Sequence, residues 1–205
     1  ALSSSSFAFQ RLALQGRARI ILYDQRSHGR SGRAEFETHH IDQLGHDLGA
    51  VIDAFAPAGP LILVGHSMGG MSIMALAEQR PELFGDRVRG VALISTTAGS
   101  ITDVSLGLPP IARQAFHRFA PRVALALAKQ KEIVERGRRS SSDLSLILTR
   151  LLSFGSLASD EAGQFVAGMI DATPIDVLAE FLPALQEHDK FSALPVLQRV
   201  EVLVI

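Results

Sequence analysis

A single serine lies among glycines where an apolar run changes into a helix-like stretch: residues 61–70 read LILVGHSMGG. A serine hydroxyl can attack a carbonyl carbon when a base removes its proton. A strand-to-helix turn this tight places its central residue at positive φ, which strains a residue that has a Cβ. The same turn directs the backbone N–H of Met68 toward the place of a substrate carbonyl oxygen, at a helix start that favours negative charge. The spacing therefore predicts a nucleophile at Ser67 and an oxyanion donor at Met68.

The residues around Ser67 are expected to support this turn. Gly65 and Gly69 stand two positions on either side of the serine, where small residues let the helix approach the strand closely, and Gly70 extends the small-residue stretch. His66 is expected to project away from the serine and to pack. The alternative is a structural glycine turn between a strand and a helix, which explains the glycines but not the serine. The spacing of the glycines fits neither phosphate-binding motif, G-x-x-x-x-G-K-[ST] or G-x-G-x-x-G.

A second set of polar residues has the spacing of metal ligands. His39, Asp42 and His46 share one helical face at i, i+3 and i+7. The apolar stripe that includes Ile41 and Leu44 indicates that the face with the histidines is solvated. We therefore predict neither a metal site nor an organic cofactor.

The composition limits the classes of partner. The chain has 205 residues, is 47% hydrophobic, and carries 20 basic and 21 acidic side chains, so no strong field favours nucleic acid or an anionic membrane. The absence of cysteine removes disulfides, thiolate metal sites and a cysteine nucleophile. No apolar run approaches the roughly 18–20 residues that span a bilayer. These features predict one domain, or one domain with an insertion, in the cytoplasm; they do not indicate an oligomeric state.

Strand-like and helix-like segments alternate in the first half of the chain. Residues 19–24, 61–65 and 88–96 are typical of strands, and residues 3–15 and 70–80 of helices. Another helix, with Thr38 as its cap, is predicted from apolar residues at helical spacing, namely Ile41, Leu44, Leu48, Ile52 and Phe55. Four helix-like segments follow, near 108–136, 143–153, 159–171 and 174–187, before strand character returns. The pattern predicts an α/β fold with a mostly parallel sheet flanked by helices: a core at 1–99, a helical insertion at 100–195 and a return strand at 196–205.

Two motifs resemble those of the α/β-hydrolase fold family. VGHSMGG after LIL resembles the family's nucleophile elbow, and YDQRSHGRSG at 23–32 resembles its D-x-R-G-x-G-x-S loop, with Ser27 where glycine is usual. Residues 100–195 stand where such enzymes carry a helical lid. The resemblance implies a serine hydrolase that cleaves a carboxylic ester or a related acyl bond through an acyl-enzyme, without a cofactor. The Leu, Ala, Phe and Val content of the lid segments fits an apolar acyl or alkyl pocket, and it equally fits packing between the lid helices. The expected substrate is a small apolar molecule of acyl or ester type.

The resemblance also leaves other activities open. A cofactor-free haloperoxidase or perhydrolase, or a hydrolase of carbon–carbon bonds, would use the same serine, and a non-catalytic member would bind a ligand without turnover. Haloalkane dehalogenases and epoxide hydrolases of this fold need an aspartate at the elbow, so Ser67 argues against them.

The partners that the family gives its serine are expected outside this chain. The family order is serine, then acid, then histidine, which places both partners beyond Ile205, and the second oxyanion donor would precede Ala1. Within the chain, His188 is a candidate for an unusual base and Asp103 for the acid. A central strand between 19–24 and 61–65 would also be missing. We therefore expect a fragment that lacks both ends, is inactive by itself, and is aggregated or molten when expressed alone.

Overall fold

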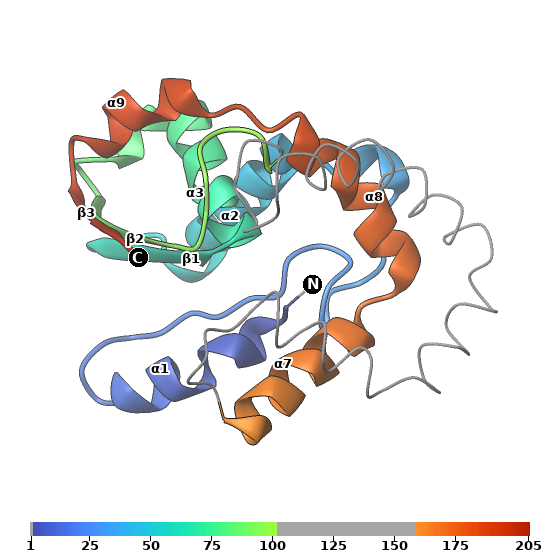
Figure 1. Cartoon of the computed structure of the whole chain (residues 1–205). Helices are drawn as coiled ribbons and strands as arrows, with labels where there is room; N and C mark the ends of the chain where they lie inside the picture. Colours follow the sequence, from blue (N-terminus) through green and yellow to red (C-terminus); the bar gives the residue numbers. More distant parts are fainter. Residues whose placement is uncertain (1, 102–158) are drawn as a thin grey trace. The chain divides into compact units, whose positions relative to one another are not determined.

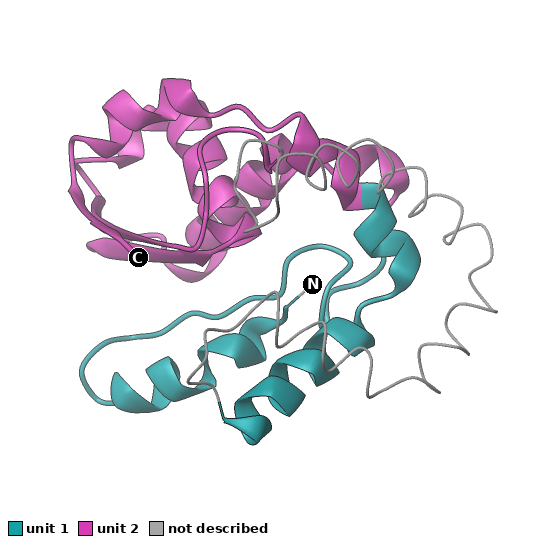
Figure 2. Cartoon of the chain, viewed as in Figure 1, with its two compact units in different colours: residues 1–34, 106–180 teal, residues 35–105, 181–205 magenta. Residues whose placement is uncertain are grey.

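The computed structural model describes residues 2–101 and 159–205 of the chain. These residues belong to two compact units, one formed by residues 1–34 and 106–180 and the other by residues 35–105 and 181–205 (Figure 2). The division does not follow the expected boundaries of core and lid, and the lid therefore stays a prediction. The predicted helices at 108–136 and 143–153 lie outside the described residues.

The second unit contains a parallel sheet (Figure 1). Its strands are β1 (Leu61–His66), β2 (Val88–Ile94) and β3 (Glu201–Val204), in the order β1-β2-β3 with both pairings parallel. The strands predicted at 61–65 and 88–96 are confirmed. The return strand is shorter than the predicted 196–205 because α9 (Leu194–Leu197) occupies its beginning, with Pro195 in the first turn. The fixed φ of proline suits the first turn of a helix.

Two helices pack together in the second unit, α2 (Ile41–Phe55) and α3 (Met68–Gln79), and α3 also contacts β1. The predicted stripe of α2 is buried except at its end, where Phe55 is 57% exposed. The predicted cap at Thr38 is wrong: its Oγ1 donates to the Glu35 carbonyl oxygen at 2.7 Å. The N-cap is His40, whose Nδ1 accepts from the Gln43 N–H at 3.2 Å. The unit also contains the short 3₁₀ helices η2 (Phe36–Thr38), η3 (Pro81–Leu83) and η5 (Phe191–Ala193).

The first unit contains helices from both ends of the chain. Residues near the beginning form η1 (Ser4–Phe7) and α1 (Ala8–Ala13), which confirms the helix predicted at 3–15. The predicted helices at 159–171 and 174–187 are confirmed as α7 (Asp160–Ala172) and α8 (Ile175–Gln186), and the boundary of the units falls inside α8. None of the described helices has both the length and the apolar composition needed to cross a membrane.

The strand predicted at 19–24 is wrong. These residues adopt no regular structure and lie outside the described sheet. A strand is defined by its hydrogen-bonded neighbour, whereas the sequence pattern reports only the apolar and β-branched composition of the segment itself.

Candidate active site

Ser67 lies between the last residue of β1 and the first residue of α3, with φ of 51° and ψ of −121°. Positive φ is the conformation that the sequence predicts for this turn, and it strains a residue with a Cβ. The side chain is exposed to solvent. In open parallel sheets, ligands bind outside the carboxyl ends of the strands, which is where this turn lies. The turn therefore presents a hydroxyl at the part of the fold where a substrate would be expected.

The backbone of Ser67 is held by hydrogen bonds on both of its polar groups. Its N–H donates to the Ile94 carbonyl oxygen of β2 at 2.9 Å. Its carbonyl oxygen accepts from the N–H of Gly70 at 2.9 Å and from Oγ1 of Thr96 at 2.8 Å. The strained conformation is thus fixed from the neighbouring strand as well as from α3.

The glycines around the turn do not all have the expected role. A Cβ at Gly65 would lie 2.5 Å from the carbonyl carbon and oxygen of Gly69, and a Cβ at Gly70 would lie 2.5 Å from Cγ2 of Thr96. Both distances are too short for real atoms, so both positions require glycine. A Cβ at Gly69 would meet nothing within 4 Å among the described residues. The expected close approach therefore depends on Gly65 and Gly70, and the part of Gly69 is to supply the backbone against which Gly65 packs.

Met68 is the first residue of α3, and the helix continues to Gln79. The first four N–H groups of a helix have no partner within it, and the partial positive charge of a helix start favours an anion there. The first turn of α3 contains no acidic residue that would oppose this. The Met68 N–H therefore has the electrostatic setting that an oxyanion donor needs.

His66 is the last residue of β1 and is half-buried. Burial lowers the pKa of His66 below its usual range. Burial therefore disfavours a positive charge on the imidazole beside Ser67. Its packing role stays a prediction.

The three residues expected on one helical face do not share a helix, because His39 precedes α2, which begins at Ile41. His39 is 4% exposed, and its ring lies 4.6 Å from that of Phe181, so the interpretation of this face as solvated is wrong for His39. Asp42 forms an ion pair with Lys190 at 2.9 Å, and His46 is exposed. Among the residues that the structure describes, no group of three or more His, Cys, Asp or Glu side chains could hold a metal ion.

His188 is not placed to serve as an exposed base. It is 4% exposed, and its Nε2 lies 3.0 Å from the Thr97 carbonyl oxygen. Its Nδ1 is enclosed without a hydrogen-bond partner among the described residues. Burial lowers the pKa of His188, although the bond to Thr97 acts in the opposite direction. Asp103 lies outside the described residues, and an acid and a histidine beyond Ile205 stay predictions.

The loop at 23–32 belongs to the first unit and is ordered around Asp24. Its carboxylate accepts from the N–H groups of Ser4 at 2.6 Å and Arg30 at 2.9 Å. Burial raises the pKa of Asp24, but these hydrogen bonds outweigh it and leave the pKa below its usual value. Ser27, which replaces the usual glycine, has φ of 62°, and its Oγ accepts from the Ala34 N–H at 3.0 Å. The positive φ explains why glycine is common at this position.

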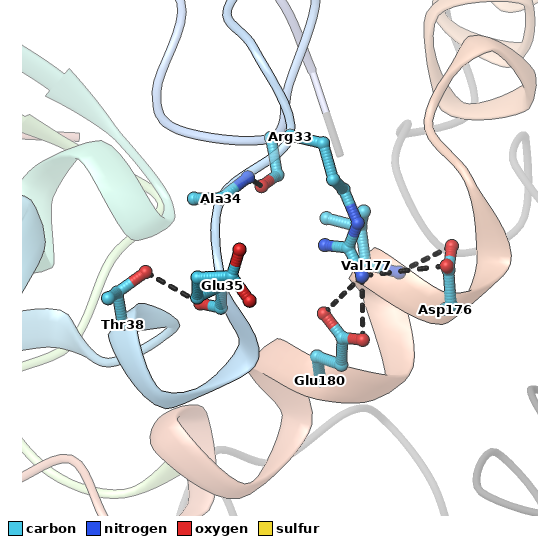
Figure 3. A network of polar contacts seen from close by, with 8 residues as sticks. Arg33, Ala34, Glu35, Thr38, Asp176, Val177 and Glu180 are labelled. Carbon is cyan, nitrogen blue, oxygen red and sulfur yellow. Dashed lines mark hydrogen bonds and ion pairs between the residues drawn. The ribbon is translucent and has the colours of Figure 1, made fainter.

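Arg33, which follows this loop, binds two carboxylates of α8 (Figure 3). Its Nη2 lies 2.6 Å from both carboxylate oxygens of Glu180 and 3.5 Å from Oδ2 of Asp176. These are contacts within the first unit. They give the loop a second attachment, besides the bonds around Asp24.

Two residues near Ser67 have no signal in the sequence. Among the described residues, the non-glycine residues with positive φ are Ser27, Ser67 and Ser95, and Ser95 follows the end of β2 with φ of 46°. Thr96 comes next and contacts the turn at Ser67. Only the register of β1 against β2, which pairs His66 with Ile94, brings these residues to the site.

Comparison with known proteins agrees with this architecture. The model of the alpha/beta hydrolase family matches residues 1–202. Two curated RutD proteins, each named as a carbamate hydrolase, are 36% identical, over 80 residues in Caulobacter sp. strain K31 and over 83 residues in Azorhizobium caulinodans. The matches cover 39% and 40% of this chain but only 30% and 29% of those proteins. The chain therefore spans less than a third of the curated relatives it matches.

Solved structures share the fold over almost the whole chain. The enol-lactonase from Burkholderia xenovorans LB400 is 25% identical with a TM-score of 0.69, covering 99% of this chain and 67% of that one. An esterase from Exiguobacterium antarcticum is 18% identical with a TM-score of 0.69, covering 99% and 68%. A bromoperoxidase from Bacillus anthracis is 18% identical with a TM-score of 0.68 and the same coverage. The family match, the parallel sheet with its helices and these structures agree, and the chain belongs to the alpha/beta hydrolase family.

Proposed function

We propose that Ser67 is the nucleophile of a serine hydrolase that cleaves a carboxylic ester or a related acyl bond through an acyl-enzyme. One observation carries the proposal: an exposed serine is held at positive φ between a parallel strand and the start of a helix. Strained residues cluster at functional sites because their cost is retained only where the surrounding structure and function demand it. Ser27 and Ser95 also have positive φ, so the strain supports the proposal only together with the exposed hydroxyl and the helix that starts at Met68.

The reaction has two halves. Ser67 Oγ attacks the carbonyl carbon of the substrate while a histidine beyond Ile205 takes the hydroxyl proton. The negative charge that develops on the carbonyl oxygen is stabilised by the Met68 N–H. The histidine then protonates the leaving alcohol as the bond to it breaks. Water, activated by the same histidine, attacks the acyl-serine ester, releases the carboxylic acid and restores Ser67.

The names of similar proteins support an acyl substrate. The enol-lactonase and the esterase are both named for cleavage of an ester-type bond. The enol-lactonase is also the more similar of the two in sequence, at 25% against 18%. A small apolar acyl group is the substrate class that fits the composition of residues 100–195.

Covalent labelling of the complete protein with a fluorophosphonate probe tests the nucleophile. We expect the wild type to be labelled and Ser67→Ala to show no labelling. Ser72→Ala is the matched control, because Ser72 is a buried serine of α3, the helix that begins directly after Ser67, and its Oγ donates to the Met68 carbonyl oxygen at 2.9 Å. Labelling of Ser67→Ala at the wild-type level would show that another residue reacts.

Cleavage of a carbamate is the second candidate, because both curated relatives are named as carbamate hydrolases. A carbamate carbonyl can be attacked by the same serine with the same oxyanion donor. Hydrolysis of matched ester and carbamate chromogenic substrates by the complete protein separates the candidates. A kcat/KM at least tenfold higher for the ester supports the esterase, and the reverse supports the carbamate hydrolase. A protein that binds but does not turn over either substrate would be a non-catalytic member.

A further inference from the structure

Thr96 contacts the turn at Ser67 from outside α3. Its Oγ1 donates to the Ser67 carbonyl oxygen at 2.8 Å. Its side chain also fills the space beside Gly70, where an added Cβ would lie 2.5 Å from Cγ2 and 2.7 Å from Oγ1 of Thr96. The hydroxyl and the methyl group of Thr96 therefore both contact the residues that form the turn.

The Ser67 carbonyl is one half of the peptide group whose other half is the Met68 N–H. A peptide group is planar and rigid, so the direction of its carbonyl oxygen fixes the direction of its N–H. The hydrogen bond from Thr96 is therefore a constraint on the orientation of the Met68 N–H. A hydrogen bond accepted by the carbonyl also polarises the peptide and strengthens its N–H as a donor.

Ser95 brings Thr96 to this position. Its N–H donates to the Ile205 carbonyl oxygen at 2.8 Å, which continues the pairing of β2 with β3 past the end of the strand. Its φ of 46° then changes the direction of the chain, and Thr96 leaves the path of β2 and reaches the neighbouring turn. The strain at Ser95 thus has a structural consequence at Ser67.

We infer that Thr96 is a positioning residue that orients the Met68 N–H toward the developing oxyanion, an inference that rests on the proposed function of Ser67. Thr96 does not touch the reacting atoms. Its effect passes through one peptide group, and it depends on the hydroxyl rather than on the bulk of the side chain.

The test compares labelling rates of the complete protein with the fluorophosphonate probe. Thr96→Val keeps the shape of the side chain and removes the hydrogen-bond donor. We expect its labelling rate to fall by about ten- to a hundredfold, which is no more than the loss of rate caused by removing an oxyanion donor itself. Thr38→Val is the matched control, since Thr38 Oγ1 also donates to a backbone carbonyl, that of Glu35 at 2.7 Å, in a different part of the chain. We expect its labelling rate to match that of the wild type.

A second pair separates the hydroxyl from folding effects. Thr96→Ser and Thr96→Ala both lack the γ-methyl group, and only Thr96→Ser keeps a donor. We expect Thr96→Ser to label within about threefold of the wild type and Thr96→Ala to label at least tenfold more slowly. The inference would be overturned if the folded Thr96→Val and Thr38→Val variants were labelled at equal rates. It would also be overturned if the folded Thr96→Ser and Thr96→Ala variants were labelled at equal rates. Wild-type labelling that persists in Ser67→Ala would instead refute the proposed function, whatever the Thr96 variants do.

Discussion

Replacement of Ser67 by glycine should stabilise the protein relative to replacement by alanine. A non-glycine residue in a sparsely populated φ/ψ region costs about 1–3 kcal/mol, and Ser67 has φ of 51° and ψ of −121°. Glycine escapes this cost but loses more backbone entropy on folding, by about 0.5–1 kcal/mol relative to alanine. The difference leaves Ser67→Gly more stable than Ser67→Ala by about 1 kcal/mol, which is about a fivefold change in the folding equilibrium.

Urea denaturation of the two variants in the complete protein measures this difference. Both variants lack the hydroxyl, so only the backbone preference separates them. Ala50→Gly is the control, because Ala50 is an exposed residue inside α2, and there glycine should destabilise by about 0.5–1 kcal/mol. If Ser67→Gly is no more stable than Ser67→Ala at an unchanged denaturant slope, the turn carries no strain and the reasoning from φ is refuted.

Two further predictions concern the supports of the site. Gly65→Ala should destabilise the protein by about 3 kcal/mol or more, since its Cβ would lie 2.5 Å from the backbone of Gly69 and a packed backbone cannot give way as a flexible side chain does. Gly32→Ala, which meets nothing within 4 Å among the described residues, should change the urea midpoint little, and an equal effect of both would contradict the steric argument. Lys190→Met should cost about 1–2 kcal/mol, between the values for exposed and buried ion pairs, because Lys190 Nζ lies 2.9 Å from Asp42 and 2.6 Å from Glu78. Burial alone lowers the pKa of Lys190, but the two carboxylates outweigh burial and raise the pKa. The ion pairs therefore stabilise the folded protein at pH values below the ordinary lysine pKa, and this stabilisation is lost as the pH rises through the raised pKa. Stability curves of wild type and Lys190→Met should therefore converge at alkaline pH, and a constant gap would show that the ion pairs are not its source.

The parts of the fold that the sequence predicts are those with local causes. The strand at 61–65 follows from a continuous apolar run and is confirmed. The stripe of α2 follows from helical spacing and is buried except at Phe55. The turn at Ser67 is also local, because a strand, small residues and a helix start follow one another directly.

The features that could not be predicted depend on residues distant in the sequence. His39 is buried because Phe181 packs against its ring, and the spacing of the histidines in the sequence contains no information about α8. Residues 19–24 have a strand-like composition but pair with no strand of the described sheet, and the pairing partner of a segment cannot be inferred from its own composition. The contact of Thr96 with Ser67 is likewise a property of strand register, which a single sequence does not specify.

The hydrogen bonds of Ser67 and Ser95 explain how the fold tolerates the backbone strain at the turn between β1 and α3. Ser67 and Ser95 follow the ends of adjacent parallel strands, and each donates its N–H to a carbonyl of the next strand segment, Ile94 and Ile205 respectively. The N–H of each strained residue makes the last hydrogen bond of a parallel strand pair, so neither change of chain direction leaves that N–H without a partner. The Ser67 carbonyl oxygen accepts hydrogen bonds from the Gly70 N–H and from the hydroxyl of Thr96, the residue after Ser95. The sheet holds both kinks through its pairing and thereby constrains the peptide group between Ser67 and Met68. This is the preorganisation that the proposed oxyanion role of the Met68 N–H requires.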